Sequence, residues 1–68
     1  MSTYDLEVLA GWNVAAKALA EYGLNYANVI LWNRPKSLDQ VSFVSGQHRA
    51  AEFALLTNEV PEKLLSVV

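Results

Sequence analysis

The fold class is decided by SLDQVSFVSGQHRAAEFALLT, residues 37–57. Its first four residues fit the capping box S-x-x-Q, in which a serine and a glutamine satisfy the free N–H groups at a helix start. Apolar residues then recur at helical spacing in two stripes. The sequence therefore predicts a helix from Leu38 to about Thr57 that is contacted on two sides.

The segment Gln40–Gly46 also fits a β-strand, because it is rich in β-branched residues, partly alternates and ends at glycine. Paired with Asn28–Trp32 it would give an α+β fold, a helix–β-hairpin–helix. We favour the helix, because the capping box opens it and Gln47–Leu56 continues the helical pattern. The strand stays open as the alternative.

A second long helix is predicted over residues 3–23, with Ser2 or Thr3 as N-cap and Gly23 as the residue that ends it. Its apolar stripe is rich in small residues. Gly11 lies in mid-helix, where glycine costs roughly 1 kcal/mol relative to alanine. This position indicates a close helix crossing or a kink.

Between the two helices, Asn25–Lys36 is long for a helix–helix connection. Its aromatic and β-branched residues favour a packed extended loop or one short strand. After Asn58, a plausible left-handed stop, Pro61–Val67 predicts a short last helix. The predicted fold is one small all-α domain over residues 1–68, an antiparallel helical hairpin with a long packed connector and a short C-terminal helix.

Residue types needed for catalysis or metal binding are scarce. There is no cysteine and only one histidine, which excludes disulfides and thiolate zinc sites. His48 and Glu52 lie one helical turn apart, but zinc needs three or four ligands, so we expect a structural histidine. Ser42 and Ser45 lack a nucleophile-elbow pattern, and the glycines are isolated. We predict no enzymatic activity, no cofactor and no small-molecule substrate.

Charge and hydropathy exclude two further classes of partner. The net charge is −2 and the five basic residues are scattered, so a nucleic-acid partner is not expected. The longest apolar run, Val29–Trp32, is far shorter than the ~20 residues that span a bilayer. No signal peptide is recognisable at the start. We therefore expect the protein in the cytoplasm.

Apolar residues are in excess, at 53%, and charged residues are few, at 18%, against roughly 45–50% and 25% in average chains. A domain this short buries little of its surface. We therefore expect a structural or interaction protein that docks on a larger assembly or on copies of itself, or alternatively a small inhibitor of an enzyme or defence complex. The alanine-rich and aromatic positions predicted to bind the partner are Gly11, Trp12, Ala15, Tyr26, Trp32 and Arg34. Tyr26 and Trp32 could instead cap the core of the chain itself.

The segment FVSGQHRAA at residues 43–51, followed by Leu55-Leu56 and Pro61, resembles short phage proteins encoded among head and portal genes. The resemblance covers about a third of the chain. It implies an accessory protein of the virion, with a corresponding location, or a phage protein that inhibits a host enzyme or defence complex. No site residues follow from it.

Overall fold

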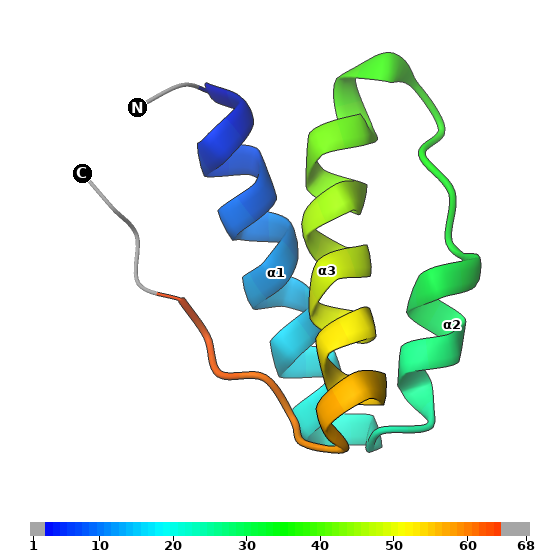
Figure 1. Cartoon of the computed structure of the whole chain (residues 1–68). Coiled ribbons are helices and arrows are strands. Elements are labelled where there is room, and N and C mark those ends of the chain that lie inside the picture. Colours follow the sequence, from blue (N-terminus) through cyan, green and yellow to red (C-terminus); the bar gives the residue numbers. More distant parts are fainter. Residues whose placement is uncertain (1–2, 65–68) are drawn as a thin grey trace.

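A computed structural model of the chain describes residues 3–64 (Figure 1). It contains the helices α1 (Thr3–Tyr22), α2 (Tyr26–Trp32) and α3 (Val41–Thr57), with a short 3₁₀ turn η1 (Leu38–Gln40) before α3. Helix α3 lies between α1 and α2 and runs parallel to α1 and antiparallel to α2. The predicted antiparallel pairing of the two long helices is therefore wrong, because α2 reverses the chain once and the turn before α3 reverses it again. Residues 3–64 hold no strand, so the all-α prediction is confirmed and the α+β alternative is wrong.

The helical segment of residues 38–57 begins differently from a capping box. Ser37 makes no side-chain cap bond. Instead, the Gln40 side-chain oxygen accepts a hydrogen bond from the backbone N–H of Lys36 at 2.9 Å. The first turn is consequently 3₁₀, closed by a 3.2 Å bond from the Gln40 N–H to the Ser37 carbonyl. At the other end, Asn58 adopts the predicted left-handed conformation, with φ 57°.

The predicted extended connector is wrong, because its first half forms helix α2. Gly23, with φ 88°, ends α1, and the chain reverses within three residues. Ala27 and Ile30, one helical turn apart, are both buried in the core. Burial of these two side chains on one helix face outweighs the β-preference of the local residue types, which is weak and depends on context.

Helices α1 and α3 meet backbone to backbone at two glycines. A Cβ atom added to Gly11 would lie 1.9 Å from the carbonyl oxygen of Phe43, and one added to Gly46 would lie 2.0 Å from that of Val8. Real Cβ atoms do not approach backbone so closely. Of the two explanations predicted for Gly11, the structure shows the close crossing.

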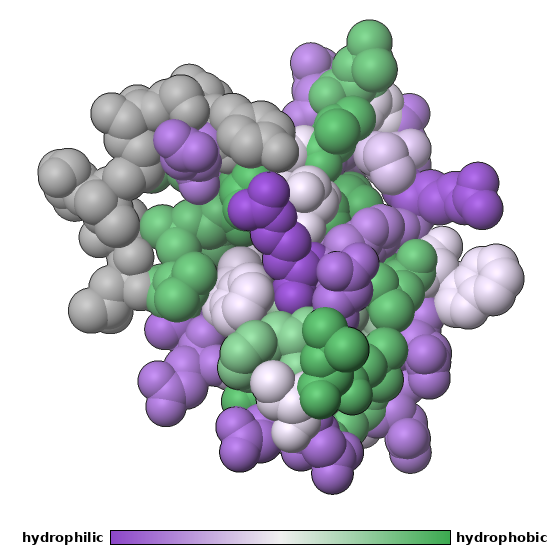
Figure 2. Space-filling view, in the orientation of Figure 1, coloured by the Kyte–Doolittle hydropathy of each residue, from purple (hydrophilic) through white to green (hydrophobic). Residues whose placement is uncertain are grey.

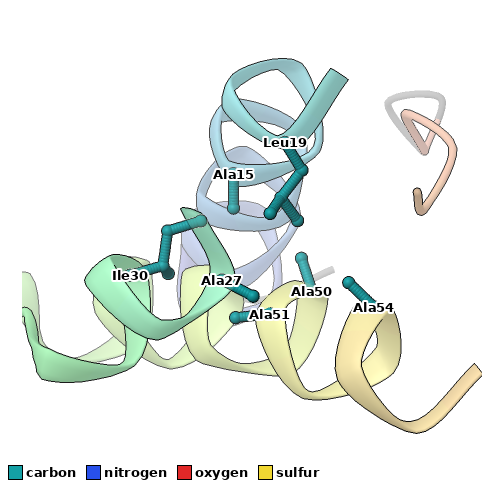
Figure 3. Packing of buried hydrophobic residues seen from close by; sticks show 7 residues of the cluster. All are labelled: Ala15, Leu19, Ala27, Ile30, Ala50, Ala51 and Ala54. Atoms are coloured by element: carbon teal, nitrogen blue, oxygen red, sulfur yellow. The ribbon is translucent and has the colours of Figure 1, made fainter. Parts of the chain in front are cut away.

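The core around this crossing is built mainly from alanine. Figure 3 shows its seven buried members, in which Ala27 and Ala51 point toward one another and Ala50 and Ala54 face Leu19. Leu19 is the only large side chain that is completely buried among the described residues. Many large apolar side chains therefore remain outside the core.

Residues 58–64, here called the tail, turn back along α1 on the side away from α2 (Figure 1). The predicted helix over Pro61–Val67 is wrong for residues 61–64, which form no helix. Its remaining residues, like the predicted cap Ser2, lie outside the described part. The Pro61 side chain is buried, and hydrogen bonds from α1 fix the tail in place of helical packing.

Candidate protein-binding surface

Two of the predicted partner-binding residues lie inside the molecule. Gly11 and Ala15 are buried in the contact between α1 and α3. The alanine-rich stripe is consequently used within one chain, because small side chains allow the two backbones to approach. The prediction that this stripe binds a partner is corrected by the structure.

Trp32, in contrast, lies at the end of α2 and is 78% exposed. It borders a hollow of about 430 Å³ between α1 and α2. The hollow is partly walled by Val14, Ala18 and Val29, of which Val14 is 50% and Val29 is 55% exposed. We call Val14, Ala18, Val29 and Trp32 the Trp32 face. Here a large aromatic side chain stands beside an apolar depression of the same surface.

The residues that line this hollow carry no charge. Asn33 and Gln47 are polar, and the Asn33 amide donates to the Gln47 side-chain oxygen at 3.3 Å. Their polar groups are thus partly satisfied within the chain, which lowers the cost of covering them. Apolar side chains make up most of the remaining wall.

Tyr26 lines the same hollow as Trp32 but is packed differently, whereas Arg34 lies elsewhere. Tyr26 is half-buried, packs against the core and stacks on Tyr22 with ring centroids 5.0 Å apart. Arg34 is exposed and lines a separate depression of about 210 Å³, together with Lys36 and Phe43. Thus Tyr26 caps the chain's own core, as the alternative reading of the sequence proposed, whereas Trp32 does not.

A second surface lies on α1, where the tail is bound. The Trp12 indole Nε1 donates to the Glu62 carbonyl at 2.6 Å. The Asn13 carboxamide donates to the Leu64 carbonyl at 2.8 Å and accepts from the Leu64 N–H at 2.6 Å. The Trp12 ring also contacts Phe53 edge to face, with centroids 5.7 Å apart. We call Trp12, Asn13 and Phe53 the tail site. Of these three residues, only Trp12 is among the partner-binding residues predicted from the sequence.

Other exposed apolar side chains lie toward the ends of the bundle. Leu38 in η1 is 90% exposed and Leu56 near the end of α3 is 87% exposed. Figure 2 shows apolar side chains gathered over the top of the molecule and over the lower part of α3, with polar side chains between them. Neither leucine lines one of the hollows described above.

His48 has a structural role. Its Nε2 atom lies 2.8 Å from the Asn33 carbonyl oxygen and so connects α3 to the end of α2. Glu52, one turn further along α3, is exposed. Within residues 3–64 there is no group of three His, Asp or Glu side chains placed to hold a metal ion. None of the helices in this part of the chain has both the length and the hydropathy needed to cross a membrane.

Comparison with family models, curated proteins and solved structures finds no match to this chain. The resemblance to phage head and portal proteins thus stays a prediction.

Proposed function

We propose that this chain is a non-catalytic protein that associates with a second copy of itself through the Trp32 face. The observation that carries the proposal is a tryptophan 78% exposed beside an uncharged hollow lined mainly by apolar residues. Tryptophan is among the residues that contribute most to binding free energy at protein interfaces. Leaving it in water costs hydrophobic free energy that burial in a partner would recover.

The arrangement of this face favours a second copy over an unrelated partner. A two-fold symmetric interface uses one patch on both subunits, so the patch must be complementary to itself. The Trp32 face has both a projecting ring and a hollow, lying next to each other. A two-fold axis through the face would bring each Trp32 toward the hollow of the other copy.

Charge supports the same choice. The chain has a net charge of −2, so two copies repel each other weakly. Burying an unpaired charge would add a large desolvation cost. Because the hollow is lined by uncharged residues, two copies can meet there without burying a charged side chain of the lining.

A stable interface buries about 800 Å² on each partner, roughly a sixth of the 4,846 Å² surface of this chain. Trp32 alone cannot supply that area. Its neighbours Val14 and Val29 are half exposed, and Tyr22 is 66% exposed. Docking on a larger assembly was the other partner predicted from the apolar excess, but the presence of an exposed ring and a hollow on one face favours self-association.

Sedimentation velocity over a range of concentrations tests the proposal. The unmodified chain is expected to form dimers, and Trp32→Ala to remain monomeric at the same concentrations. Leu56→Ala is the matched control, because it also removes a highly exposed apolar side chain, but far from the hollow. The proposal fails if the unmodified chain is monomeric throughout, or if both substitutions weaken association equally.

A further inference from the structure

The tail is held on α1 mainly through its own backbone. Trp12 bonds to the Glu62 carbonyl, and Asn13 bonds to both the N–H and the carbonyl of Leu64. A carboxamide that bonds both groups of one residue resembles the pairing of a neighbouring strand. Because these bonds do not involve the tail's side chains, they hold any extended segment that reaches the same place.

The tail site also has an apolar part. A groove of about 380 Å³ lies between Trp12, Phe53 and the tail residues, including Val60 and Leu64. Pro61 is the one buried residue of the tail, and the others are exposed. Aromatic grooves with a side-chain donor are the usual binding sites of extended segments that contain proline. The segment known to fit this site is residues 60–64 of the chain itself.

The turn that directs the tail onto α1 depends on one residue in the left-handed region. Asn58 has φ 57°, which L-residues adopt at a cost, although asparagine tolerates it better than most. The Thr57 hydroxyl donates to the Phe53 carbonyl at 2.7 Å and accepts from the Glu59 N–H at 3.3 Å, which supports the turn. Changing Asn58 to an extended conformation would carry the tail away from its own α1.

We infer that the tail site also binds residues 59–64 of a second copy, so that two copies exchange their tails. Each tail site then makes the same hydrogen bonds as when the tail binds its own α1. The backbone of Asn58 can leave the left-handed conformation. The inference rests on the proposed self-association, because a tail in the same chain has an effective concentration of the order of millimolar. Two copies held together by the Trp32 face give the partner's tail a comparable local concentration.

Photo-crosslinking in the full chain tests this exchange. A photoreactive amino acid replaces Leu64, whose bonds to Asn13 are made by main-chain atoms, and ¹⁵N-labelled and unlabelled chains are mixed. After irradiation, mass spectrometry should find crosslinks that join a labelled to an unlabelled chain and that map to α1 near Trp12. The same photoreactive group at Leu56, outside the tail, should not map there.

Three substitutions, one at Asn13 and two at Asn58, sharpen the result. Asn13→Ala removes both bonds to Leu64 and should lower the yield of α1 crosslinks, within and between chains, by about tenfold. Asn58→Gly lowers the cost of the left-handed turn that directs the tail onto its own α1, so it should shift crosslinks toward the same chain. Asn58→Val raises that cost and should shift crosslinks toward the partner.

The outcomes separate the two proposals. Crosslinks to α1 that stay within one chain, in a sample that sedimentation shows to be dimeric, would overturn tail exchange and leave the Trp32 dimer intact. A chain that is monomeric in sedimentation and crosslinks only within itself would overturn both. An unchanged crosslink yield in Asn13→Ala would show that the tail site is not the one described.

Discussion

The contact between α1 and α3 and the Trp32 face are built from opposite kinds of side chain. Gly11, Ala15 and Gly46 lie inside the first, whereas Trp32 projects from the second. In most small domains the large apolar side chains fill the core. Here close approach of two backbones leaves no room for them. The chain therefore stabilises its fold by tight packing and retains much of its apolar area at the surface.

This difference explains the composition of the chain in physical terms. An alanine side chain buries little area, so a core of alanines gains less hydrophobic free energy than a core of leucines. Close backbone contact offsets part of this difference through the sum of many small dispersion contacts. The excess of apolar residues is located mainly in exposed side chains such as Trp32 and Leu56.

The largest effect on the free energy of unfolding is expected at the two glycines where α1 and α3 approach most closely. Gly11→Ala should lower the free energy of unfolding by more than about 3 kcal/mol, because the new Cβ must push against the backbone of α3. Gly46→Ala should behave in the same way against α1. Urea unfolding followed by circular dichroism measures both. The control is Ala20→Ser at an exposed position of α1.

In an open helix, the same glycine-to-alanine change would stabilise by roughly 1 kcal/mol. A gain of that size in either glycine variant would show that the two helices do not cross so closely. Tight backbone packing would then not distinguish the α1–α3 contact from the Trp32 face.

The second largest effect is expected at Leu19, the large side chain that is fully buried in the described part of the core. Leu19→Ala should cost about 2–3 kcal/mol, because it leaves a cavity in a core where residues 3–64 provide no other fully buried large side chain. Val14→Ala, on the Trp32 face, should cost well under 1 kcal/mol, since Val14 is half exposed. An equal loss of unfolding free energy in these two variants would contradict the assignment of Leu19 to the core and of Val14 to the Trp32 face.

The two long helices could be predicted from the sequence because their ends and periods are local signals. The glycine at 23 and the asparagine at 58 end α1 and α3 as predicted. Helix α2 could not be predicted, because most of its seven residues prefer strands and the helix depends on the packing of Ala27 and Ile30 in the core. Local preference and tertiary burial disagree there, and burial decides.

The site residues could be predicted from the sequence only where a local pattern marks them, and not where they depend on partners distant in the chain. A glycine in mid-helix indicates close approach, and Gly46 gives the same signal as Gly11, but Gly46 also fits the end of the alternative strand over Gln40–Gly46. Asn13 gave no signal at all, because its partner Leu64 is 51 residues away. The sequence placed Trp12 and Trp32 in one set, but only the structure shows that one binds the tail and the other faces solvent.

The third prediction compares these two tryptophans directly. Trp12→Phe removes the indole donor to the Glu62 carbonyl and should cost about 1 kcal/mol of unfolding free energy. Trp32→Phe removes an indole that has no hydrogen-bond partner among residues 3–64 and should leave stability unchanged. In ¹H–¹⁵N spectra, the indole N–H that survives in Trp32→Phe should exchange slowly with solvent. Rapid exchange of that proton would show that the tail is not bound to Trp12.

The smallest effect on the fold is expected at Trp32 itself. Trp32→Ala removes the largest exposed ring, but 78% of its surface already contacts water, so the monomer should change in stability by less than about 0.5 kcal/mol. Unfolding must be measured at low concentration, where dimers do not add to the apparent stability. At high concentration the unmodified chain should become more stable and Trp32→Ala should not. If Trp32→Ala instead destabilised the dilute monomer by several kcal/mol, the ring would pack in the core of its own chain. The Trp32 face would then not be available to bind a second copy.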